Sequence, residues 1–143
     1  MHMLHHISLG VSDIERSAAF YDAVLGALGY VRVFEDLRPG GTGQAVGYGR
    51  PGEDDKLSIK QAAASPASTM PRFHIAFAAP SREAVHNFHD QALKQGGRDN
   101  GPPGPRPSYG PHYHASFVLD PDGYRLEAVI NTASEAAAAT IGG

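Results

Sequence analysis

Eight histidines and no cysteine are the main chemical feature of this 143-residue chain. Without cysteine, disulfides, thiolate–zinc sites and a cysteine nucleophile are all excluded. A metal site here must use histidine nitrogens and carboxylate oxygens. Two histidines and one carboxylate can hold a divalent ion on one side and leave its other positions open for water, substrate or oxygen. Such a site depends on which of these side chains the fold brings to one surface.

The chain contains an internal repeat, which predicts that it is built from two similar units. Residues 6–30 align without a gap on residues 74–98, beginning with His6 on His74 and ending with Gly29 on Gly97. The repeat predicts one domain over residues 1–143, made of a first module at about 1–65 and a second at about 70–131. An Ala-rich tail follows at 132–143.

Each module is predicted to begin with a strand and a helix. Apolar and polar residues alternate over 6–11 and again over 72–79, which is typical of a half-buried strand. Helical spacing follows each strand. Ser12 and Glu15 fit a capping box before the first helix, and Ser81 is the expected cap of the second.

Three further strands are predicted in each module, which indicates an α+β fold of two βαβββ modules. They are expected at 30–34, 44–49 and 57–61, and then near 98, at 114–119 and at 124–131. Residues 120–123, Asp-Pro-Asp-Gly, form the turn between the last two. A loop rich in Gly and Pro is predicted between Gly96 and Pro111.

Strand alternation also predicts which polar side chains share a concave face opposite the helices. His6, His74 and Glu127 fall on that face and form a candidate metal triad. The alternative interpretation is that each histidine is an ordinary polar residue on a strand. The same face is predicted to carry Ser58, Lys60, Arg125, His112, His114 and Ser116.

Composition argues against two classes of partner. The formal net charge is −3, with 12 Lys and Arg against 15 Asp and Glu, so no basic surface for nucleic acid or anionic lipid is expected. No apolar run approaches the roughly 20 residues that span a bilayer, and the N-terminus lacks the pattern of a signal peptide. The expected protein is a soluble cytoplasmic globule.

Both ends of the chain resemble the vicinal oxygen chelate superfamily, the group of glyoxalases, bleomycin-resistance proteins and extradiol dioxygenases. The opening run, residues 4–15 with Phe20-Tyr21 and Leu25-Gly26, is similar to the start of that family, and residues 117–127 are similar to its end. The resemblance implies two βαβββ modules that form a cupped mixed sheet with helices on the outside. It also implies one divalent metal (Fe, Mn, Ni, Co or Zn) on His6, His74 and Glu127.

One position departs from the pattern of glyoxalase I. That enzyme carries a further carboxylate on the strand equivalent to the last one, where this chain has Ser58. An unactivated hydroxyl is a poor base at neutral pH. The resemblance therefore implies a metal-dependent enzyme with lyase, thiol transferase or dioxygenase chemistry on a substrate chelated through oxygen. The alternative is a non-catalytic protein that binds an antibiotic-type small molecule.

The remaining site residues are interpreted in the light of this resemblance. His114, Tyr113 and His112 are candidates for proton transfer, and Ser58, Lys60, Arg125 and Tyr109 are candidates for substrate binding. For Tyr109 and His112, a position in an exposed loop is the alternative. Family members of this length commonly exchange modules between two chains, so a homodimer is expected.

Overall fold

The computed structural model describes residues 3–63 and 70–133, and it has the predicted α+β arrangement of two βαβββ modules. The first module contains β1 (Ile7–Val11), α1 (Ile14–Gly26), β2 (Val31–Asp36), β3 (Ala45–Gly49) and β4 (Leu57–Gln61). The second contains β5 (His74–Ala78), α2 (Arg82–Lys94), β6 (Arg98–Pro105), β7 (Tyr113–Leu119) and β8 (Arg125–Asn131). Residues 134–143 of the Ala-rich tail lie outside the described residues.

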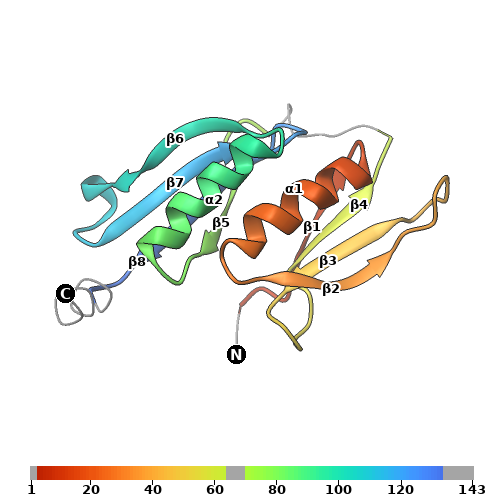
Figure 1. Ribbon diagram of the computed structural model, residues 1–143, viewed down its shortest axis with the longest axis horizontal. Coiled ribbons are helices and arrows are strands. Elements are labelled where there is room, and N and C mark those ends of the chain that lie inside the picture. The colour runs from red at the N-terminus through yellow and green to blue at the C-terminus, as the bar shows by residue number, and fades with distance from the viewer. Residues whose placement is uncertain (1–2, 64–69, 134–143) are drawn as a thin grey trace.

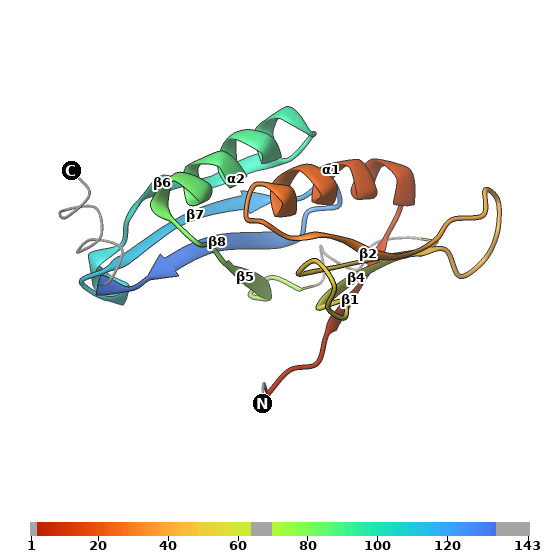
Figure 2. The same ribbon diagram turned by 60° about the horizontal axis from the view of Figure 1, so that its bottom comes forward.

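The strands form two four-stranded sheets, ordered β1-β4-β3-β2 and β5-β8-β7-β6. In each sheet the first strand of the module pairs in parallel with the last, and the other pairs are antiparallel. Both helices lie side by side on the same side of the two sheets (Figures 1 and 2). The buried apolar side chains of helices and strands form one continuous core. The polar faces of the strands therefore lie on the opposite side of each sheet.

The cap of α1 differs from the prediction. Asp13, not Ser12, is the N-cap, and its carboxylate accepts a hydrogen bond from the Arg16 amide at 3.1 Å. Ser12 instead donates its hydroxyl to Asp122 in the second module, at 2.5 Å. The predicted cap of α2 is confirmed, because the Ser81 hydroxyl accepts from the Ala84 amide.

The turn at 120–123 connects the two modules as well as joining β7 to β8. The buried Tyr21 hydroxyl on α1 donates to Asp120 at 2.5 Å. The Tyr124 hydroxyl, directly after the turn, donates to the carbonyl oxygen of Gly10 at the end of β1, at 2.7 Å. These contacts, with the helix–helix packing, hold the modules together on the helix side.

Most of the predicted loop after Gly96 is instead a strand. β6 covers Arg98–Pro105 and pairs with β7 through a register interrupted at two places, and a short 3-10 helix follows at Pro107–Tyr109. The prolines and glycines hide the strand from sequence patterns. They are tolerated because β6 is an edge strand with irregular pairing. In the described parts of the chain, no helix is long and apolar enough to cross a membrane.

Candidate functional site

His74 and Glu127 lie beside each other on the face of the second sheet that the helices leave uncovered. β5 and β8 pair in parallel, and the His74 Nε2 atom lies 3.2 Å from the Glu127 Oε1 atom. The His74 side chain is half-exposed at 50%, whereas that of Glu127 is only 3% exposed. The pair lines a hollow of about 400 Å³, called here the C-terminal hollow. Its lining residues are His74, Tyr109, Tyr113, Phe117 and Glu127.

Tyr113 orients the Glu127 carboxylate. Its hydroxyl donates a short hydrogen bond to Glu127 Oε2, which leaves Oε1 toward His74. Burial, and then the nearby Glu127 carboxylate, raise the pKa of Tyr113 well above its usual value. The phenol therefore keeps its proton at neutral pH and donates it in the hydrogen bond to Glu127. Tyr109 packs its ring edge-on against that of Tyr113, with the ring centres 5.3 Å apart, and remains largely exposed.

His6 lies on the uncovered face of the first sheet. It lines a hollow of about 390 Å³, called here the N-terminal hollow. The lining residues are His6, Ser8, Phe34, Ala45, Asp55, Ser58 and Lys60. Ser58 pairs with Ser8 on β1 and with Gly47 on β3, so small residues form a row across this sheet. The lining thus includes the three residues that were predicted to share one face, His6, Ser58 and Lys60.

The donor set in the C-terminal hollow fits a divalent metal. Histidine nitrogen and carboxylate oxygen ligands lie about 2.0–2.2 Å from such an ion, so two neighbouring ligands are about 3 Å apart. The 3.2 Å between His74 Nε2 and Glu127 Oε1 matches that separation. Glu127 is buried and already oriented by Tyr113.

The two hollows share no lining residue. Among residues 3–63 and 70–133, no group of three or more His, Asp and Glu side chains lies close enough to hold a metal ion. His74 and Glu127 are brought together, but His6 does not join them. The predicted triad is therefore not assembled within the described residues of one chain.

The face of β7 is opposite to the prediction. Phe117 pairs directly with Glu127, so the odd-numbered residues, including Tyr113, share the face of Glu127. His114 and Ser116 instead face α2. The His114 Nε2 atom lies 3.1 Å from that of His86, and the Ser116 hydroxyl donates to the Val85 carbonyl. The polar residues of this segment indicated the wrong face, because the pairing register with β8 decides which side chains lie beside Glu127.

Two other predicted residues lie outside the hollows. His112 is exposed just before β7 and lines neither one. Arg125 donates through Nη1 to the Met70 carbonyl at 3.1 Å, which ties it to the segment before β5. The hollows are also lined by three residues that were not predicted to do so, Asp55, Phe34 and Phe117. Asp55 stands in a loop, where no periodic pattern indicates a facing direction.

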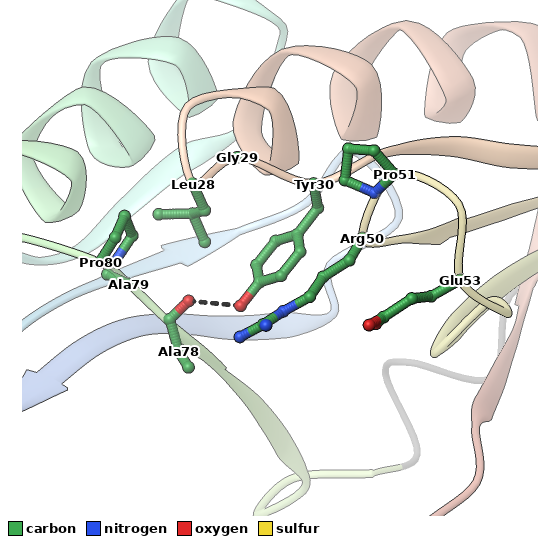
Figure 3. Close-up of a pocket in the computed structure, with 9 residues that line it drawn as sticks. All are labelled: Leu28, Gly29, Tyr30, Arg50, Pro51, Glu53, Ala78, Ala79 and Pro80. Carbon is green, nitrogen blue, oxygen red and sulfur yellow. Dashed lines mark hydrogen bonds between the residues drawn. The ribbon is translucent and has the colours of Figure 1, made fainter.

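A third hollow, of about 510 Å³, lies at the junction of the modules. The Tyr30 hydroxyl donates there to the Ala78 carbonyl at 2.7 Å, and the Arg50 side chain extends alongside the Tyr30 ring (Figure 3). Glu53 is the only carboxylate among the described residues that line it, and no histidine does. None of the predicted site residues lines this hollow.

The fold and the His–Glu pair define a paired-module α+β protein with a candidate metal site on its strand faces. The chain belongs to the Glyoxalase/Bleomycin resistance protein/Dioxygenase superfamily, whose sequence model matches residues 3–128. Comparison with curated proteins finds no match.

Solved structures share the fold. A glyoxalase/bleomycin resistance protein from Albidiferax ferrireducens T118 is 27% identical, with a TM-score of 0.70, and the alignment covers 90% of this chain and 98% of that one. A glyoxylase/bleomycin resistance protein/dioxygenase domain from Frankia sp. EAN1pec is 18% identical, with a TM-score of 0.67 and coverage of 92% and 99%. An E144Q glyoxalase I mutant from Zea mays is 20% identical, with a TM-score of 0.64. That alignment covers 88% of this chain and 46% of the maize chain.

Proposed function

We propose that this protein is a metal-dependent enzyme that acts on a small substrate through adjacent oxygen atoms, in a homodimer with two sites. Each site would combine His6 of one copy with His74 and Glu127 of the other. The observation that carries the proposal is the 3.2 Å contact between His74 Nε2 and Glu127 Oε1, on an uncovered face that lacks His6.

We propose a homodimer because each hollow contains only part of the metal-ligand set. The N-terminal hollow has a histidine with Lys60 and Ser58, and the C-terminal hollow has the histidine–carboxylate pair. Phe34 is 52% exposed and Tyr109 is 64% exposed, so each hollow also presents an aromatic ring to solvent. Joining one hollow to the other of a second copy would complete the ligand set and cover both rings.

The chain's own residues have distinct roles in this proposal. His6, His74 and Glu127 hold the ion, which when bound supplies Lewis-acid stabilisation of negative charge on substrate oxygen. Tyr113 keeps Glu127 oriented through its hydrogen bond. Lys60 attracts an anionic substrate into the N-terminal hollow. Tyr109 and Phe117 enclose its apolar part.

Metal content and mass in solution test the proposal. We expect elemental analysis of protein purified under reducing conditions to find one divalent ion per chain, and light scattering to find a dimer at micromolar concentration. Turnover is then assayed with thiols, catechols and 2-oxoaldehydes. Protein that takes up no divalent metal under reducing conditions would contradict the proposal.

A mixing experiment tests the shared site directly. His6→Ala and Glu127→Ala homodimers each lack a ligand in both sites. A dimer refolded from one chain of each variant regains one intact site if His6 and Glu127 come from different copies. It regains none if they come from the same copy. We expect about half of the wild-type metal content per mixed dimer.

A non-catalytic binder is the second candidate, favoured by the aromatic side chains in both hollows, Phe34, Tyr109 and Phe117. Aromatic rings can enclose a flat organic ligand without any metal. Ligand binding that survives both metal removal and Glu127→Ala would support this candidate over the enzyme.

A further inference from the structure

The loop between β3 and β4 folds back over the open face of the first sheet. Gly47 and Gly49 make this possible. A Cβ atom on Gly49 would lie 2.4 Å from the Asp54 carbonyl oxygen, and one on Gly47 would lie 2.8 Å from the Asp55 Cβ atom. Because real Cβ atoms do not approach this closely, only glycine at both positions lets residues 54 and 55 lie against β3.

This close approach directs the Asp55 carboxylate over the sheet. The Asp55 Oδ2 atom would lie 3.1 Å from a Cβ on Gly47, and Gly47 pairs with Ser58 on β4. In the second sheet the equivalent pair is Phe117 with Glu127. The carboxylate of Asp55 thus lies over the row of Gly47 and Ser58, whereas the second module carries its carboxylate on the strand itself.

The Asp55 carboxylate lacks a polar partner among the described residues. Among the described residues, its carboxylate forms no hydrogen bond or ion pair, although Lys60 lines the same hollow and Asp55 is partly buried. A partly buried carboxylate gains stability from a partner, and one that lacks it is a candidate for binding or catalysis. His6 lines the same hollow.

We propose that Asp55 is the carboxylate of the N-terminal hollow and serves beside His6 as a fourth protein ligand of the metal. This inference rests on the proposed function. It gives the hollow an anionic oxygen that Ser58 does not supply, from a loop instead of a strand. The ion would then have ligands from both hollows in pairs, Asp55 with His6 and Glu127 with His74.

Co²⁺ alone is a suitable probe, because its visible spectrum responds to the number and type of its ligands as well as to occupancy. We expect Asp55→Asn to weaken Co²⁺ binding to the dimer at least tenfold and to change the spectrum of the loaded protein. Asp54→Asn, the matched control on the neighbouring residue, is expected to bind Co²⁺ within twofold of wild type.

Two further variants separate a ligand role from a structural one. Gly47→Ala forces its Cβ against Asp55 and should weaken Co²⁺ binding, with no further loss when it is combined with Asp55→Asn. Ser58→Glu in the Asp55→Asn background returns a carboxylate to the same hollow. We expect this double variant to recover Co²⁺ affinity to within threefold of wild type.

The outcomes distinguish this inference from the proposed function. If Asp55→Asn binds Co²⁺ like wild type while His6→Ala does not, Asp55 is not a ligand and the proposed function stands. If wild-type protein itself does not bind Co²⁺, both are overturned. A loss in Asp55→Asn that Ser58→Glu fails to recover, with Gly47→Ala unaffected, also overturns the ligand role.

Discussion

Ser12 and Asp122 are 110 positions apart in the chain, and their side chains meet at 2.5 Å between the Ser12 Oγ and Asp122 Oδ1 atoms. Asp122 also accepts from the Ser12 amide and lies within 3.4 Å of the Ser17 hydroxyl. The turn between β7 and β8 of the second module therefore holds the start of α1 in the first. This contact lies on the helix side and leaves the strand faces of both modules uncovered.

Ser12→Ala is expected to lower the free energy of unfolding by about 1–2 kcal/mol, because a buried carboxylate loses a hydroxyl donor. Asp122 keeps its other donors, so the fold should remain. Urea unfolding followed by circular dichroism measures the change. Thr42→Ala, an exposed hydroxyl in a loop, is the matched control. Equal stability of the two variants would contradict a link between the modules at Ser12.

Asp120 should make stability depend on pH. Burial raises the pKa of Asp120, although hydrogen bonds from Tyr21 and from the Asp122 and Tyr124 amides favour its ionised form. A carboxyl group whose pKa is raised in the folded state binds its proton more tightly there than in the unfolded chain. Protonation therefore stabilises the fold fully at pH values below the unfolded pKa, and this stabilisation is lost as pH rises through the folded pKa.

Compared with Asp120→Asn, wild-type protein should therefore gain stability as pH falls from 7 toward 4. Urea unfolding of both proteins at several pH values measures this difference. Tyr21→Phe removes a donor to the ionised form and should shift the gain to higher pH. A difference between wild type and Asp120→Asn that is constant with pH would show that the Asp120 pKa is not raised.

His6→Ala, His74→Ala and Glu127→Ala are each expected to lower metal affinity at least tenfold without unfolding the domain. The reason is that each removes one donor from a set of three or four. Titration calorimetry with a divalent ion measures the affinity, and circular dichroism checks the fold. His86→Gln, a histidine on the exposed surface of α2, is the matched control and should bind metal like wild type.

Tyr113→Phe should weaken metal binding about tenfold, because groups that orient a metal ligand typically contribute 10–100-fold to affinity. The variant keeps the ring and its packing against Tyr109 but loses the hydrogen bond to Glu127. Calorimetry is again the measurement, with thermal unfolding as the check on stability. An unchanged affinity would mean that Glu127 is oriented without Tyr113.

The pattern of residues along the chain was enough to predict the two modules and the face of the first and last strands of each. The repeat that aligns His6 with His74 and the period-two alternation are local properties, and they are not changed by packing. These patterns place both His74 and Glu127 on the uncovered face, and the parallel pairing of β5 with β8 then brings the two side chains together.

Tertiary structure decided what depends on partners distant in sequence. The face of β7 is determined by its register with β8, so Tyr113 and not His114 reaches Glu127. The cap of α1 passes to Asp13 because Ser12 bonds to Asp122. His6 does not join His74 and Glu127 among the described residues, and the Asp55 carboxylate enters the N-terminal hollow because Gly47 gives it room. A sequence specifies local periodicity directly, whereas contacts between distant segments exist only once the chain has packed.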